Sequence, residues 1–93
     1  MPKVKLYNVF RNRVGKAELE VPNEHPMTID ELLDELDARA PGFRGLVLGG
    51  NSDRPRSGVA VMINGRTIVA PRPLATPVSP EDVVTFVPAI SGG

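Results

Sequence analysis

One amphipathic helix among strand-like segments is the feature that most constrains this fold. The helix is predicted to begin at a capping box, because the Thr28 hydroxyl can accept from the amide of Glu31 while the glutamate reaches back to the amide of Thr28. Apolar residues then recur at helical spacing along one side: Ile29, Leu32, Leu33, Leu36 and Ala40. Pro41 and Gly42 end the helix. A single helix covers one face of a sheet, so we expect an α+β protein whose other sheet face meets solvent.

Strand-like alternation occurs on both sides of this helix. The segments are residues 3–10, 16–21, 59–63, 66–70 and 83–87. A short polar link that ends at Gly15 joins the first two as an antiparallel hairpin, and Asn64-Gly65 is a strong hairpin turn between the next two. If the first and last strands are parallel neighbours joined by a right-handed crossover, the topology is the β-grasp, with a mixed sheet of four to five strands.

The middle of the chain carries weaker signals. Residues 43–48 suggest a short turn or an extended piece that docks under the sheet edge, and residues 49–58 form a predicted loop. The glycines here follow a helix and do not open one after a strand, which argues against a phosphate-binding loop. Arg54 and Arg56 are interpreted as solvated loop charges that a partner could use.

Composition excludes several classes of function. Eleven basic and eleven acidic residues give zero formal charge, which argues against binding nucleic acid or a membrane surface. The absence of cysteine removes disulfides and thiolate chemistry. The single histidine, His25, has no neighbouring nucleophile, and the helix carboxylates are spaced for a solvated face. We therefore expect no metal site and no self-contained active site; the chain also shows no signal peptide, so a cytoplasmic location is expected.

Side-chain alternation in the last strand predicts an exposed patch. Phe86 and Val84 should face the helix, which leaves Val83, Thr85 and Val87 on the open face. The same alternation places Met62 outside, with Tyr7 and Val9 of the first strand. Single exposed apolar residues are normal, but a cluster beside the chain terminus would suit a partner. The candidate partner-binding residues are Met62, Val83, Thr85, Val87, Tyr7 and Ile90.

The last five residues differ from the rest of the chain. Residues 1–88 are predicted to form one β-grasp domain, and residues 89–93, Ala-Ile-Ser-Gly-Gly, a flexible tail. Glycine loses more backbone entropy on ordering than any other residue, so two terminal glycines do not help the domain to fold. Two interpretations stand: a frayed terminus, or a carboxylate freed of side chains so that it can enter a narrow catalytic channel.

The final residues also carry a family resemblance. Residues 83–93, Val-Val-Thr-Phe-Val-Pro-Ala-Ile-Ser-Gly-Gly, closely resemble the C-terminus of the MoaD family of ubiquitin-like sulfur carriers, the small subunits of molybdopterin synthase and their relatives. The resemblance extends over nearly the whole chain, in residues 4–21, 62–65, 74–78 and 81–84. Pro88-Ala89 stands where many molybdopterin-synthase subunits have Pro-Pro. The Pro-Ala form of this chain is also seen in related carriers that serve cysteine synthesis.

The resemblance implies a carrier without a cofactor of its own. The Gly93 carboxylate would be adenylated with ATP in an E1-like enzyme of the MoeB or ThiF kind, and a sulfur donor protein would displace AMP to leave a thiocarboxylate. Gly92 would act sterically, because a side chain there should block the channel. In molybdopterin synthase the charged tail would insert into the large subunit and pass sulfur to a pterin precursor in molybdenum or tungsten cofactor synthesis.

Other functions remain open. A ubiquitin-like modifier shares the same chemistry through the adenylate but then forms isopeptide bonds to lysines. A carrier for cysteine synthesis or another sulfur pathway would use the same tail. An interaction module would carry an idle tail, and deleting Gly93 would then change nothing.

Overall fold

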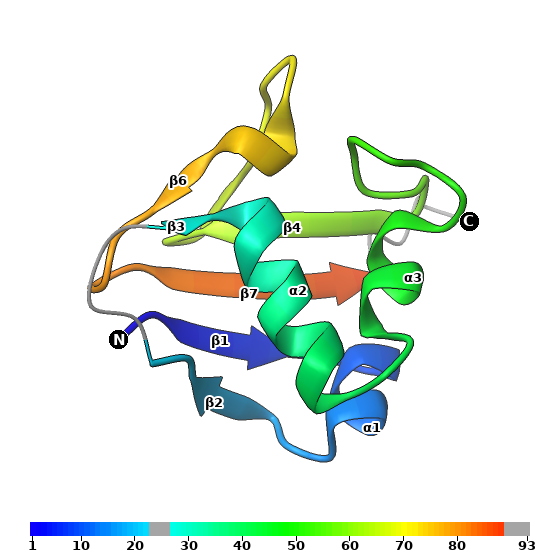
Figure 1. The fold of residues 1–93 in the computed structure, drawn as a ribbon, viewed down its shortest axis with the longest axis vertical. Coiled ribbons are helices and arrows are strands. Elements are labelled where there is room, and N and C mark those ends of the chain that lie inside the picture. The colour runs from blue at the N-terminus through cyan, green and yellow to red at the C-terminus, as the bar shows by residue number, and fades with distance from the viewer. Residues whose placement is uncertain (23–26, 89–93) are drawn as a thin grey trace.

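A five-stranded mixed sheet forms the centre of the protein, in the order β2-β1-β7-β4-β5. The computed structural model describes residues 1–22 and 27–88. The strands are β1 (Lys3–Leu6), β2 (Glu18–Glu20), β4 (Val59–Ile63), β5 (Arg66–Thr67) and β7 (Val83–Pro88). β1 and β7, the first and last strands, lie side by side in parallel, and every other pair is antiparallel (Figure 1). The predicted β-grasp is confirmed.

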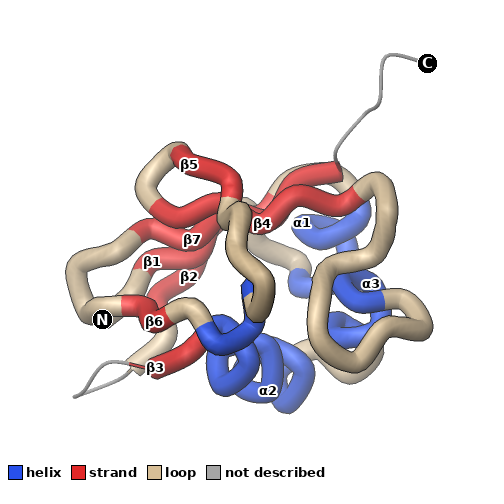
Figure 2. The backbone as a smooth tube through the Cα atoms, turned by 90° about the horizontal axis from the view of Figure 1, so that it is seen from above, coloured by secondary structure: helices blue, strands red, loops and turns tan. Residues whose placement is uncertain are grey.

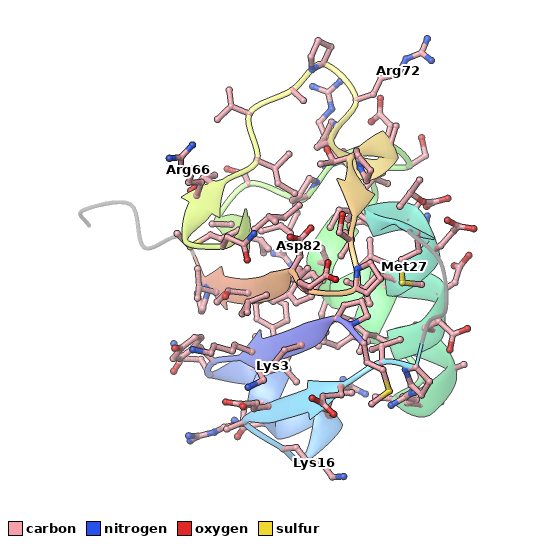
Figure 3. The ribbon with its side chains drawn as sticks, turned by 90° about the vertical axis from the view of Figure 1, so that its left-hand side faces the viewer. Lys3, Lys16, Met27, Arg66, Arg72 and Asp82 are labelled. Atoms are coloured by element: carbon pink, nitrogen blue, oxygen red, sulfur yellow. The ribbon has the colours of Figure 1, made fainter. Side chains whose placement is uncertain are left out.

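The main helix, α2 (Ile29–Arg39), crosses one face of this sheet (Figures 1 and 3). The Glu31 amide donates to Thr28 Oγ1 at 3.2 Å, and the Thr28 amide donates to Glu31 Oε1 at 2.9 Å, so both bonds of the predicted capping box are present. Its predicted apolar stripe is buried, and the helix ends before Pro41. These local signals predicted α2 correctly.

The core lies between α2 and the sheet and centres on the three phenylalanines. Phe10, Phe43 and Phe86 are almost completely buried, with ring centroids 5.3–6.2 Å apart. Val4 and Leu6 of β1 and the β7 residue Val84 pack beside them, at most 1% exposed. Among the described residues no polar side chain is buried, so the core depends on apolar packing alone.

The prediction that the first strand runs to Phe10 was wrong. β1 ends at Leu6, and α1 (Val9–Val14) follows, closed by Gly15 in the left-handed conformation with φ 87°. Leu6 and Phe10 are four residues apart, a spacing that puts two side chains on one side of either a strand or a helix. Phe10 therefore reaches the core as expected, but from a helix, and Val9 lies on α1 rather than on the sheet.

The segment after α2 is also a helix, α3 (Phe43–Leu48), and not the turn or extended piece expected. The Asp37 carboxylate of α2 accepts hydrogen bonds from the amides of Gly42 and Arg44 at 3.1 and 3.0 Å, which satisfies the free amides where α3 begins. The Arg44 guanidinium pairs with Asp30 and Asp34 of α2. Its hydrogen bond to Asp30 raises the pKa of Arg44 further above its usual value. The sequence indicated that the carboxylates of α2 form a solvated face. Three of them instead bind residues at the start of α3 and hold the two helices together.

The connections around the sheet differ from the expected strands in two places. β5 has two residues instead of the five predicted, and Val69 beyond it is 91% exposed. β3 (Met27–Thr28) and β6 (Pro77–Val78) form a small antiparallel sheet that was not predicted, and the 3-10 helix η1 (Pro73–Ala75) precedes β6. The predicted loop at 49–58 contains no helix or strand, and the Asp82 amide donates to Ser79 O at 3.0 Å in the predicted turn.

Asn64, in the β4–β5 turn, ties that turn to the start of β7. Its Nδ2 donates to Asp82 Oδ1 and its Oδ1 accepts from the Val83 amide, both at 2.9 Å, while its φ is 52°, a left-handed conformation. Asn64→Ala should lower the free energy of unfolding by roughly 2–3 kcal/mol, because two hydrogen bonds are lost and alanine is strained there. Asn64→Gly loses the same two hydrogen bonds but is not strained at a positive φ, so urea denaturation should give it a smaller loss than Asn64→Ala. Equal losses would show that the hydrogen bonds account for the whole effect.

Candidate partner-binding face and the tail

The face of the sheet opposite α2 is the first part of the candidate site. Val84 and Phe86 of β7 are fully buried towards α2, and Val83, Thr85 and Val87 alternate with them on the open face, each half-buried. Seen along the sheet, α2 lies to one side of it (Figure 3). The predicted alternation of β7 is therefore confirmed, and it gives the open face a central row of side chains.

Strand register gathers the other predicted residues around this row. Thr85 pairs with Met62 of β4 on one side and with Lys5 of β1 on the other, so Met62 lies on the open face as predicted. The Tyr7 amide donates to Phe86 O at 3.3 Å, which continues the line of β1 beside Val87, and Tyr7 is 49% exposed. The patch thus exists over three neighbouring strands and borders the end of β7.

The open face also contains residues that were not predicted for it. Ala60 pairs with Val87 and lies two residues before Met62, so the alternation that identified Met62 could have found it. Towards β2 the face becomes charged: Lys3 Nζ lies 3.3 Å from Glu18 Oε1. Val9 was expected beside Tyr7 but lies on α1, 45% exposed. The patch is therefore apolar at β7 and β4 and charged at β2.

The tail begins where β7 ends, at Pro88, which pairs with Val59 of β4. Seen from above, this end of the sheet lies beside α1 and α3 (Figure 2). Ile90, Gly92 and Gly93, the predicted tail residues, lie outside the described residues, so their roles and the boundary at residue 88 remain predictions. Five residues span roughly 16–18 Å when a chain is fully extended.

The described residues contain no cluster of side chains suited to bind a metal. Within residues 1–22 and 27–88, no group of three or more His, Cys, Asp or Glu side chains could hold a metal ion. The loop pair Asp53–Arg54 is exposed, and the hydrogen bond from Arg54 lowers the pKa of the Asp53 carboxyl. His25 lies outside the described residues. None of the helices in the described part is long and apolar enough to cross a membrane.

Comparison with known proteins places the chain among small proteins of similar length. The sequence model of the ThiS family matches residues 4–93. Small archaeal modifier protein 3 of Haloferax volcanii is 26% identical over 91 residues, which cover 98% of this chain and 97% of that protein. CysO of Mycobacterium tuberculosis has a TM-score of 0.83 at 20% identity, covering 97% of this chain and 100% of its own. The BexX/CysO complex of Amycolatopsis orientalis matches with a TM-score of 0.82 at 20% identity, covering 100% of both chains.

Proposed function

This chain belongs to the ThiS family of ubiquitin-fold sulfur carriers and modifiers, and from that premise we propose that it carries sulfur on the carboxyl group of Gly93. Members of this family are small carrier proteins and not catalysts. The observation that carries the proposal is the position of β7: the central strand of the sheet ends at Pro88, five residues before Gly93, beside an apolar patch. A central strand that is held by neighbours on both sides can fix the base of the tail. The slender glycine end of the tail could then enter another protein.

The proposed chemistry takes place in an E1-like adenylating enzyme of the MoeB or ThiF kind. An oxygen of the Gly93 carboxylate attacks the α-phosphorus of ATP, pyrophosphate leaves, and the carboxyl becomes an acyl-adenylate. Sulfide from a donor protein then attacks the acyl carbon, and the bond to AMP breaks, which leaves a thiocarboxylate. ATP and its Mg²⁺ belong to the enzyme, which supplies the groups that stabilise charge. This chain contributes a glycine at position 92 that takes little space and an open face for docking.

We propose the precursor of molybdopterin as the sulfur acceptor, in a synthase whose large subunit receives the tail in the cytoplasm. The resemblance of residues 83–93 to the MoaD family supports this acceptor. Two alternatives have observations of their own. Pro88-Ala89 favours a carrier for cysteine synthesis, and 26% identity to small archaeal modifier protein 3 favours attachment to lysines.

Intact mass of the protein isolated from its native cell tests the proposal. Replacement of one terminal oxygen by sulfur should raise the mass by about 16 Da, and the C-terminal peptide should carry the whole increase. A chain that lacks Gly93 serves as the control and should show no increase. Lysine-linked conjugates would instead support the modifier, and an unmodified chain without conjugates would contradict both functions.

A further inference from the structure

A cavity lies at the end of β7, on the side of α1, and it is separate from the open face of the sheet. The cavity has a volume of about 340 Å³, and its lining includes Val9, Leu46, Arg56, Val59 and Pro88. A neighbouring depression is lined by Val9, Asn12 and Arg13. Val9 belongs to both, so they form one continuous surface, which we call the tail-root rim and define by Val9, Arg13, Leu46, Arg56 and Pro88.

The charge of the tail-root rim is entirely positive. Among the residues that the structure describes, neither of its two depressions is lined by an aspartate or a glutamate, and no acidic residue occurs between Lys5 and Lys16 in the sequence. Among the residues that the structure describes, no ion pair includes Arg13 or Arg56. These two guanidinium groups are therefore available to an external anion.

Acidic residues are concentrated elsewhere, on α2. This helix carries five carboxylates against one arginine, namely Asp30, Glu31, Asp34, Glu35, Asp37 and Arg39. Four of these carboxylates already bond within the protein: Glu31 accepts from the Thr28 amide, Asp37 accepts from the start of α3, and Asp30 and Asp34 pair with Arg44. A chain of zero net charge is thus basic at the base of its tail and acidic along α2.

Local structure holds the arginines at the edge of the cavity. The Arg56 amide donates to Val47 O at 2.8 Å, and a Cβ built on Gly49 would lie 3.1 Å from the Arg56 Cβ, so the absence of a side chain at Gly49 leaves room for Arg56. Arg13 Nη1 donates to Pro41 O at 3.4 Å, the carbonyl that follows α2. Between them Val9 is 45% exposed over the cavity, which is a large fraction for a valine.

We propose that the tail-root rim is a second docking surface, which takes an acidic segment with an apolar tip from the protein that activates the tail. The inference rests on the proposed function. Charge complementarity indicates an acidic partner, and the apolar cavity beside the arginines fits an aliphatic or aromatic side chain. The anion is a protein carboxylate rather than ATP, because a tail of roughly 16–18 Å would carry the reacting carboxyl far from its own base.

The experiment compares charge reversals at the two ends of the sheet. Arg13→Glu/Arg56→Glu changes the rim, and Arg66→Glu/Arg72→Glu makes the same charge change on the far side. Arg66 is a suitable control because it pairs with Ile63, at the opposite end of β4 from Val59 and Pro88. Binding to the adenylating enzyme of the same organism is measured by calorimetry, and adenylate formation is measured separately, after thermal unfolding confirms that each variant is folded.

The rim variant should bind the adenylating enzyme about tenfold more weakly than the original chain. In adenylate formation its KM should be higher and its kcat should stay within about twofold, because charges at the edge of an interface mainly change the association rate. Its binding should also depend less on salt than that of the original chain. The control variant should bind within about twofold of the original chain. If Arg13→Glu prevents folding, Arg56→Glu alone should give a smaller loss in the same direction.

Three results would overturn the proposal or its premise, and they are distinguishable. If the rim and control variants bind equally well while the original chain is still adenylated, the proposed docking surface is wrong but the proposed function stands. Failure of the original chain to form an adenylate would contradict the proposed function. Concentration-dependent self-association that the rim variant abolishes would show that the acidic α2 of a second copy occupies the surface instead.

Discussion

Replacing Gly92 by valine is expected to reduce adenylate formation at least about a hundredfold while the protein stays folded. A branched side chain one residue before the reacting carboxyl should prevent the tail from entering a channel shaped for glycine, and the misplacement of a reacting group by about 1 Å can already cost a hundredfold in rate. The measurement is the rate of adenylate formation by the activating enzyme with ATP, at saturating concentrations of the carrier chain. Thermal unfolding should be unchanged, because residue 92 follows the last strand.

Gly50→Val is the matched control for this variant. A Cβ added at Gly50 would meet no atom within 4 Å, so the same substitution can be made there without a clash. Gly50 lies in the sequence between α3 and β4, and this variant should be adenylated at the original rate. If Gly92→Val and Gly50→Val are adenylated equally well, the tail does not enter a narrow channel.

Phe86→Ala is expected to give the largest loss of stability in the chain, roughly 3–5 kcal/mol, against a total of about 5–15 kcal/mol for a domain of this size. Phe86 is fully buried on the central strand and contacts both other phenylalanines, with ring centroids 5.3 Å from Phe43 and 6.2 Å from Phe10. Removing the ring leaves a cavity between α1, α3 and the sheet. Urea denaturation should therefore show a lower midpoint, and Tm should fall by roughly 12 °C or more.

Val87→Ala provides the comparison on the same strand. Val87 faces the open side, half-buried, so its truncation should cost about 1 kcal/mol or less. A loss for Phe86→Ala no larger than that for Val87→Ala would show that the three phenylalanines do not form the centre of the core. Because Val87 lies in the candidate partner-binding patch, we expect this variant to weaken binding to the proposed activating enzyme more than it weakens folding.

The candidate site was predictable from the sequence where it depends on alternation along one strand. In β7 the side chains of Thr85 and Val87 must oppose those of Val84 and Phe86, whatever the neighbours are. The placement of Met62 followed from the same rule on β4. Val9 was misplaced because the rule was applied beyond the end of β1. The tail-root rim was not predictable, since Val9, Leu46, Arg56 and Pro88 come from four separate segments that only the fold brings together.

The sequence by itself determined the elements that short-range chemistry specifies. The capping box and apolar stripe determined α2, Asn64-Gly65 determined the turn between β4 and β5, and alternation determined which face of β7 is buried. Only the tertiary structure decided that Phe10 lies on a helix, because the spacing between Leu6 and Phe10 suits a strand and a helix equally. It also decided that residues 43–48 form α3, because the carboxylate that caps this helix belongs to Asp37 of α2. Local signals act over three or four residues, whereas these two helices are stabilised by contacts with side chains that the fold brings to them.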